Sequence, residues 1–340
     1  MRYDIITIGS VTHDTFLKAH YPLERWPKAP SGKALVLPFG EKLEVDDTYA
    51  TMGGNSANAS VTFARQGFRT ACFGKVGVDL PGRAIRERLE SEGVTSLLAL
   101  THDRGTASSV LLLENGERTI LGYHGASDTL SAKDIPWNKL KSAWWYLSLA
   151  GKSDVLLKPL MRFAKKNNIR VAFNPSGYHI RHRRADILSV LKDVSFLVVN
   201  TGEAADLVKI PFRREKEVFA KLDKLVPGIV AVTDGPNGVV VSDGTHRYRA
   251  GTFTEKRIAD RTGAGDAFGS GFVAGLMKKS HQSPVMGHEF GSEDIKYAIR
   301  LATANATSVV ERVGASEGTL SRSAFMNRRW KNLPISVTRL

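Results

Sequence analysis

Short apolar runs recur along the chain, and stretches with helical patterning separate them. The runs that we predict to be strands are residues 3–8, 70–73, 143–147, 171–173, 196–199 and 229–232. The best helical stretches are residues 56–66, 83–92, 155–167, 267–278 and 294–311. Strands that alternate with helices are typical of parallel βαβ units. Their continuous apolar character indicates an α/β protein whose mostly parallel sheet is covered by helices on both faces.

Two segments break this alternation. Residues 15–51 are rich in proline and charge, and residues 107–123 read as a hairpin that turns at residues 114–116. Together they predict a small β-layer that covers a site and acts as a lid. The exposed edge of such a layer needs covering, which suggests a homodimer through the lid. We expect one domain over residues 1–325, followed by a loosely held basic tail over residues 326–340.

Composition narrows the class of protein. A chain of 340 residues with 42% apolar side chains can bury a full core. The formal net charge of +14 favours anionic partners such as ATP or nucleic acid. No zinc-finger spacing, RNA-binding signature or basic zipper accompanies the charge, so nucleic acid is the less favoured partner. The single cysteine, Cys72, fits a reducing cytoplasm, and no apolar run is long enough to cross a membrane.

The most informative stretch is residues 260–271, which read DRTGAGDAFGSG. Gly263, Ala264 and Gly265 are small enough for their backbone N–H groups to converge on an anion, and the helix that follows adds the positive end of its dipole. Asp266 at the rim would repel a phosphate. That placement suggests a base that accepts a hydroxyl proton during phosphoryl transfer. The alternative is that Asp266 only caps the helix, and the turn alone leaves both interpretations open.

Residues 260–266 resemble the signature D-x-T-G-A-G-D of the ribokinase-like, or PfkB, carbohydrate kinases, and match it at every fixed position. Weaker motifs follow the family in chain order. They are GSVTHD, MGGNSANAS, GKVGVDLPG, NTGE and VTDGPNG. The resemblance spans roughly residues 3–320. It implies a doubly wound, mostly parallel sheet flanked by helices, with a small β-sheet lid.

On the acceptor side, the resemblance implies that Asp14 hydrogen-bonds the hydroxyl groups of the acceptor. Gly53, Gly54 and Asn58 would complete that site together with Asp266. Each motif also has a purely structural interpretation. Asp14 would then cap its own turn, and the two glycines would simply end a strand.

On the nucleotide side, the resemblance implies that Asn200 and Glu203 organise Mg²⁺ and its waters around the phosphates of ATP. Thr233 and Gly235 would lie against those phosphates, and Asn305 would border the adenine. The alternatives are a helix N-terminus capped by Asn200 or Thr201, and a polar helix residue that is merely solvated at Asn305.

A monovalent cation is the remaining cofactor that the resemblance raises. In many members of the family the backbone at the positions of Asp260 and Thr262 holds such an ion, together with a loop that resembles Gly314 and Ala315. After Ala315 this chain reads SEG where the family often has x-P-S. Activation by K⁺ is therefore left open.

The resulting functional hypothesis is an ATP-dependent kinase that phosphorylates a hydroxymethyl group of a sugar or sugar-like molecule. Asp266 would be the base, and the turn formed by Gly263, Ala264 and Gly265 the anion hole. A nucleoside is the second choice of acceptor, because Trp26, Phe39 and Tyr49 in the lid could stack on a base. A noncatalytic sugar- or nucleotide-binding regulator is the alternative of another class, and retention of Asp266 and Glu203 argues against it.

Overall fold

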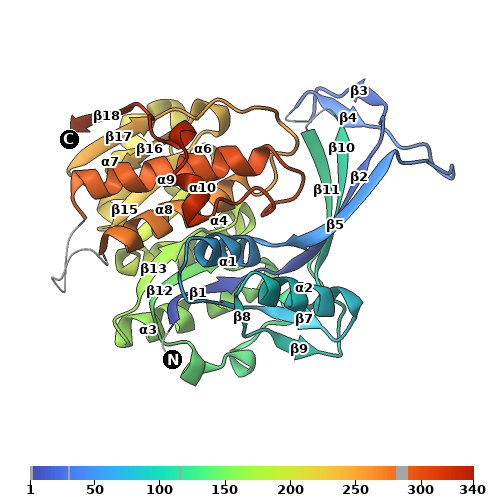
Figure 1. The fold of residues 1–340 in the computed structure, drawn as a ribbon, viewed down its shortest axis with the longest axis horizontal. Coiled ribbons are helices and arrows are strands. Elements are labelled where there is room, and N and C mark those ends of the chain that lie inside the picture. The colour runs from blue at the N-terminus through green and yellow to red at the C-terminus, as the bar shows by residue number, and fades with distance from the viewer. Residues whose placement is uncertain (1–2, 30, 115–116, 281–289) are drawn as a thin grey trace.

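A ten-stranded sheet forms the centre of the computed structural model, which describes residues 3–29, 31–114, 117–280 and 290–340 (Figure 1). Its strands, in spatial order, are β18 (Ile335–Arg339), β17 (His246–Ala250), β16 (Val239–Ser242), β15 (Ile229–Thr233), β14 (Phe196–Asn200), β13 (Arg170–Phe173), β12 (Ser142–Ser148), β1 (Tyr3–Gly9), β6 (Thr70–Phe73) and β8 (Thr95–Ser96). All six predicted strands are present in it. Pairing is parallel from β15 across to β8 and antiparallel from β15 to β18.

Helices cover both faces of this sheet, as predicted. They are α1 (Asn55–Arg65), α2 (Leu80–Ser91), α3 (Leu157–Lys166), α4 (Gly177–His182), α5 (Arg184–Val190), α6 (Thr201–Val208), α7 (Glu215–Leu225), α8 (Ala264–Ser280), α9 (Ser292–Val310) and α10 (Arg322–Phe325). Successive strand residues point to opposite faces. Trp145 of β12 accordingly packs in the cluster that includes α3, α6 and α7, whereas Tyr146 packs in the cluster that includes α1, α8 and α9.

A second sheet of four strands projects from the central one (Figure 1). Its strands, in spatial order, are β11 (Glu117–Tyr123), β10 (Ser108–Glu114), β2 (Thr12–Lys18) and β5 (Asp47–Gly53). The predicted hairpin is the antiparallel pair of β10 and β11, and residues 115 and 116 of its expected turn lie outside the described residues. Both segments that break the βαβ alternation therefore contribute strands to one layer.

Four short strands lie outside these two sheets. β3 (Leu23–Arg25) pairs with β4 (Lys33–Leu35), and β7 (Lys75–Gly77) pairs with β9 (Ala99–Thr101). The first pair lies within the segment between β2 and β5. The second lies beside α2.

The C-terminal residues differ from the loosely held tail that the sequence suggests. Strand β18 pairs with β17 over its whole length and forms the edge of the central sheet. Before it, Trp330 is buried, and its ring meets that of Phe253 edge to face at a centroid distance of 5.2 Å. Arg329 forms an ion pair with Glu311 at the end of α9. The expectation of a loose tail is wrong for these residues because apolar burial, an ion pair and strand pairing all anchor them.

Within the described part of the chain, none of the helices combines the length and the apolar character needed to cross a membrane.

Candidate active site

A glycine-rich turn leads into α8, and its neighbours hold it in one conformation. Gly263 has φ 78°, a left-handed backbone that favours glycine, and a β-carbon there would overlap the backbone of Ala315. The buried Asp260 carboxylate accepts hydrogen bonds from Thr262 N at 2.9 Å, from Thr262 Oγ1 at 2.7 Å and from Gly314 N at 3.3 Å. The Asp260 side chain therefore fastens the turn to the loop at Gly314.

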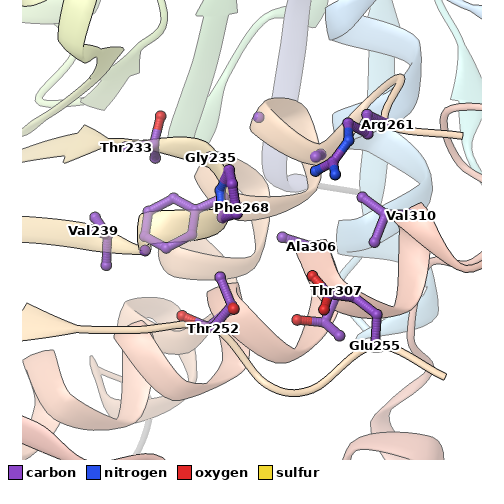
Figure 2. Close-up of a pocket in the computed structure, with 15 residues that line it drawn as sticks. Thr233, Gly235, Val239, Thr252, Glu255, Arg261, Phe268, Ala306, Thr307 and Val310 are labelled. Atoms are coloured by element: carbon purple, nitrogen blue, oxygen red, sulfur yellow. The ribbon is translucent and has the colours of Figure 1, made fainter. Parts of the chain in front are cut away.

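Two cavities meet at this turn. Thr262, Gly263 and Asp266 line one of about 320 Å³, which we call the Asp14 cavity. Ala264 and Gly265 line the other, of about 230 Å³, which we call the Thr233 cavity (Figure 2). Residues that are adjacent in the chain therefore face different cavities, and the turn forms part of the boundary between them.

Asp266, the third residue of α8, lines the Asp14 cavity. Its side chain is buried, and Oδ2 accepts a hydrogen bond of 2.9 Å from Asn58 Nδ2 of α1. Burial raises the pKa of Asp266 to about 6, and repulsion from Asp14 and Glu203 adds to that rise, while the Asn58 hydrogen bond opposes it. A carboxyl group with this pKa changes charge just below neutral pH, which suits a general base.

Asp14 and Gly54 also line that cavity, whereas Gly53, which the sequence analysis expected in the acceptor site, does not. Asp14 lies on β2, and its Oδ1 accepts a hydrogen bond of 2.8 Å from Thr12 Oγ1. Burial raises the pKa of Asp14, and the Thr12 hydrogen bond opposes the rise. A β-carbon on Gly53 would overlap the Asp14 carboxylate, so the glycine leaves room for that side chain. Gly54, with φ 90°, itself lines the cavity and precedes α1.

The remaining wall of the Asp14 cavity is mostly polar. These lining residues were missed by the sequence analysis: Ser10, Thr12, Asn55, Ser108, Ser109, His124 and Ser127. Ser127 Oγ and Asn58 Oδ1 are both buried and have no hydrogen-bond partner among the described residues. Isolated serines carry no recognisable sequence signal. Only the pairing of β10 with β2 brings Ser108 and Ser109 alongside His13 and Asp14.

The Thr233 cavity lies between the end of β15 and one face of α9. Figure 2 shows Thr233 and Gly235 on one side and Ala306 and Thr307 on the other. Gly235 has φ 53°, and nothing lies within 4 Å of the position that its β-carbon would take. The wall also contains Thr303, whose Oγ1 is buried without a hydrogen-bond partner among the described residues. Thr233 and Gly235 therefore line one cavity, and their contact with a nucleotide remains a prediction.

Asn305 does not line that cavity, so its expected contact with adenine does not fit the structure. The residue is fully buried. Its Nδ2 donates to Thr62 Oγ1 at 3.2 Å and to Ala267 O at 2.9 Å, and its Oδ1 accepts from Leu320 N at 2.8 Å. Asn305 thus joins α9 to α1, α8 and the chain beyond Gly318. The residues of α9 that do line the cavity are Thr303, Ala306, Thr307 and Val310.

We expect Asn305→Ala to lower the free energy of unfolding by about 2–4 kcal/mol, because it leaves buried donors and an acceptor without partners. Denaturant unfolding measures this change. The matched control is Thr307→Ala on the same helix, which faces the Thr233 cavity and should cost less. An Asn305→Ala protein that unfolds like the unmodified chain would show that these hydrogen bonds contribute little.

Asn200 and Glu203 lie at the junction of β14 and α6, beside neither cavity wall. Asn200 Oδ1 accepts from Glu203 N at 2.8 Å, and Glu203 Oε2 accepts from Asn200 N at 2.9 Å. This reciprocal pair is the capping box that the structural interpretation expects. Asn200 is also the ladder neighbour of Thr233, so the pair lies one strand away from the Thr233 cavity. Burial raises the pKa of Glu203, with backbone hydrogen bonding and Arg181 opposing it.

Metal binding by these residues remains a prediction. Among the described residues, no group of three or more His, Cys, Asp or Glu side chains is placed to hold a metal ion. Glu203 is a single carboxylate, and Mg²⁺ in phosphoryl-transfer sites is commonly bound by one or two carboxylates, water and substrate phosphates. The Asp260 carboxylate is used in hydrogen bonds within the protein. The monovalent cation expected near Asp260 and Thr262 also remains a prediction.

Comparisons with known proteins give a consistent result. Residues 29–322 match the model of the pfkB family carbohydrate kinases. An adenosine kinase from Saccharomyces cerevisiae is 28% identical over 306 residues, which are 85% of this chain and 86% of the relative.

Two solved ribokinases share the fold. The Giardia lamblia structure has a TM-score of 0.80 at 20% identity, covering 95% of this chain and 97% of its own. The Arabidopsis thaliana structure, complexed with ribose and ATP, has a TM-score of 0.73 at 21% identity, covering 98% of this chain and 100% of its own. This chain therefore belongs to the pfkB family of carbohydrate kinases.

Proposed function

We propose that this protein transfers the γ-phosphoryl group of ATP to a hydroxymethyl group of a sugar. One observation carries the proposal: the Asp14 cavity and the Thr233 cavity meet at a single turn whose residues line both. A phosphoryl donor in one cavity and an acceptor in the other would have their reacting groups on either side of Gly263. Phosphoryl transfer depends on such positioning and on stabilisation of negative charge.

Asp266 is the proposed base. It lines the acceptor side, it is buried, and its pKa of about 6 leaves it ionised at neutral pH. Asn58 Nδ2 donates a hydrogen bond to Asp266 Oδ2, and this bond orients the carboxylate toward a hydroxyl in the cavity. The proton of that hydroxyl moves to Asp266 as the oxygen attacks phosphorus. Asp14, Asn58 Oδ1 and Ser127 Oγ are placed to bind the other hydroxyl groups of the acceptor.

The turn formed by Gly263, Ala264 and Gly265 is the proposed anion hole. It opens α8, whose N-terminal N–H groups and dipole favour negative charge. Open space surrounds the β-carbon position of Gly265, so a phosphate can approach the backbone closely there. The transferring phosphoryl group would be stabilised by these fixed donors without rearrangement of the protein.

The nucleotide would occupy the Thr233 cavity. The described wall of this cavity combines apolar side chains such as Phe268 and Val310 with the unpartnered Thr303 hydroxyl, a composition that suits a base with a few polar edges. The related Arabidopsis ribokinase was solved with ATP and ribose, which supports this donor. Asn200 and Glu203 would hold Mg²⁺ through water. The ion, when bound, neutralises charge on the phosphates.

The acceptor is more consistent with a sugar than with a nucleoside. Most of the side chains that line the Asp14 cavity carry hydroxyl, amide or carboxylate groups. Trp26, Phe39 and Tyr49, the lid residues that the sequence suggested for base stacking, do not line the cavity, whereas Tyr123 of β11 does. A nucleoside remains the second candidate because the yeast relative is an adenosine kinase.

The four-stranded sheet is the proposed lid over the acceptor. Thr12 and Asp14 of β2, Ser109 of β10 and Gly122 of β11 all reach the Asp14 cavity from it. Closure would exclude water and limit hydrolysis of ATP. Leu121 of β11 is exposed and does not line the Asp14 cavity, and we place the proposed homodimer contact on the sheet face that carries it. Sedimentation of the purified protein tests this association.

The pH dependence of turnover should report Asp266. A base must be ionised to accept a proton, so we expect kcat/KM for the acceptor to fall about tenfold for each pH unit below about 6. Above that pH the base is ionised and the profile should level off. Acceptor-dependent ADP formation in buffers of constant ionic strength measures the profile. A rate that stays constant from about pH 7 to about pH 5 would show that no group with this pKa limits the reaction.

The function itself is tested by ATP consumption with Mg²⁺ across sugars, sugar phosphates and nucleosides. We expect turnover that depends on the acceptor and is highest with one sugar. Turnover confined to a nucleoside would select the second candidate. Tight binding of ATP without turnover on any acceptor would favour the noncatalytic interpretation.

A further inference from the structure

A basic hollow lies away from the site described above, at the other end of α8. We call it the Lys278 pocket. It has a volume of about 760 Å³ between the ends of α1 and α8, the face of α9, α10 and the chain after Trp330. Lys278 is twelve residues beyond Asp266 on one helix, which corresponds to about 18 Å. Binding here would therefore be separate from the Asp14 and Thr233 cavities.

Positive charge dominates this pocket. Five basic side chains line it, and none of its described lining residues is acidic; the five are Lys278, Lys279, Arg300, Arg322 and Lys331. They come from α8, α9, α10 and the segment before β18, so the fold brings them together from separate parts of the sequence. Basic side chains usually spread over solvated faces, because bringing like charges together costs energy. Their convergence in a hollow is the first argument for a bound anion.

Lys278 carries the second argument. It is half-buried, and its Nζ donates a 2.6 Å hydrogen bond to the neutral Oε1 of Gln66. Burial lowers the pKa of Lys278 to about 8, and repulsion from Arg322 contributes. The Lys278 ammonium group is therefore partly desolvated and lies near the positive charge of Arg322. An anion in the pocket would offset both the desolvation of the ammonium group and its repulsion from Arg322.

Arg300 carries the third argument, because its guanidinium is held in place and incompletely satisfied. Its Cζ lies 5.4 Å from the ring centroid of Tyr297 and 5.5 Å from that of Phe325. One terminal nitrogen donates to Lys331 O at 3.3 Å, whereas Nε is buried with no hydrogen-bond partner among the described residues. A guanidinium stacked on aromatic rings presents a preorganised set of donors, which suits a phosphate.

We propose that the Lys278 pocket binds a small phosphorylated anion. A compact hollow of this volume is typical of small-molecule sites. Nucleic acid, in contrast, is usually bound along an extended basic stripe that follows its backbone. The aromatic rings of Tyr297 and Phe325 line the same pocket, so an organic phosphate with an apolar part fits it as well as an inorganic one.

Calorimetric titration with inorganic pyrophosphate, at constant ionic strength and without Mg²⁺, tests the proposal. The pocket variant is Lys278→Gln with Arg322→Gln. The control, Arg213→Gln with Lys216→Gln, removes the same charge from an exposed part of the surface. We expect the dissociation constant to rise at least about tenfold in the pocket variant and to change less than about twofold in the control, because direct contacts outweigh long-range charge. The single variant Arg322→Gln changes an exposed residue, so it gives a result even if the Lys278 substitution disturbs folding.

A second measurement locates the bound pyrophosphate. The Lys278 amine is acylated with and without pyrophosphate, and mass spectrometry of the peptide that contains it measures the extent of modification. Pyrophosphate should slow the modification of Lys278 and leave that of Lys216 unchanged. Equal affinities of the pocket variant and the control, or unprotected Lys278, would overturn the proposal. Stronger protection by a single-stranded oligonucleotide than by pyrophosphate would overturn the assignment to a small anion. Neither measurement depends on phosphoryl transfer. A failure of this pocket proposal can therefore be told apart from a failure of the proposed function.

Discussion

Replacing Asp266 with asparagine should lower kcat about 10²–10⁴-fold while changing the affinity for ATP little, because it removes the base but leaves the anion hole. The substitution keeps the shape of a side chain that contacts Asn58. Acceptor binding should be retained for the same reason. Acceptor-dependent ADP formation measures kcat, and equilibrium dialysis measures the two affinities.

Two controls show whether this loss is chemical. Glu293→Gln neutralises an exposed carboxylate on α9 and should leave kcat unchanged.

Stability supplies the second control. Ionisation of Asp266 opposes folding because its pKa is raised in the folded protein, and this penalty is absent below pH 3.8 and fully present above about pH 6. Asp266→Asn should therefore raise the free energy of unfolding at pH 7.5 by about 1–3 kcal/mol. Full activity in this variant would remove Asp266 from the mechanism.

Replacing Gly263 with alanine should lower kcat/KM about 10²–10³-fold, because the turn would have to move away from its productive geometry. Its φ of 78° is strained for alanine, and the new β-carbon would overlap the backbone of Ala315. We also expect the free energy of unfolding to fall by about 2–4 kcal/mol. Steady-state kinetics and denaturant unfolding measure the two effects.

Gly265→Ala is the matched control for that experiment, two residues along the same turn. Nothing lies within 4 Å of the added methyl group, and alanine favours a helix by up to about 1 kcal/mol, so stability should not fall. The methyl group would point toward the Thr233 cavity and should raise KM for ATP. Equal loss of stability in both variants would contradict the close packing of Gly263 against Ala315.

Much of the acceptor side could be predicted from sequence because its residues lie in short motifs. Asp14, Gly54, Asn58 and Asp266 do converge on one cavity, although their roles remain proposals. The serines of that cavity could not be predicted, since nothing in an isolated serine specifies its neighbours. Ser108 and Ser109 arrive through strand pairing between segments about a hundred residues apart.

Asn305 shows a different limit. Residues 303, 306, 307 and 310 have the spacing of one helix face and line the Thr233 cavity, whereas Asn305 points into the protein. A motif match at one position does not say which face of the helix meets the ligand. The C-terminal segment is similar, because residues 335–339 alternate like a strand but the pattern does not identify β17 as their partner.

The most direct test of the central claim is identification of the product formed from ATP and the best acceptor. We predict that mass spectrometry finds a singly phosphorylated acceptor and that phosphorus NMR finds the phosphate coupled to the two protons of a CH₂ group. The protein with Asp266→Asn should form this product at a greatly reduced rate. Release of inorganic phosphate with an unchanged acceptor, or phosphate on a ring hydroxyl, would contradict the account.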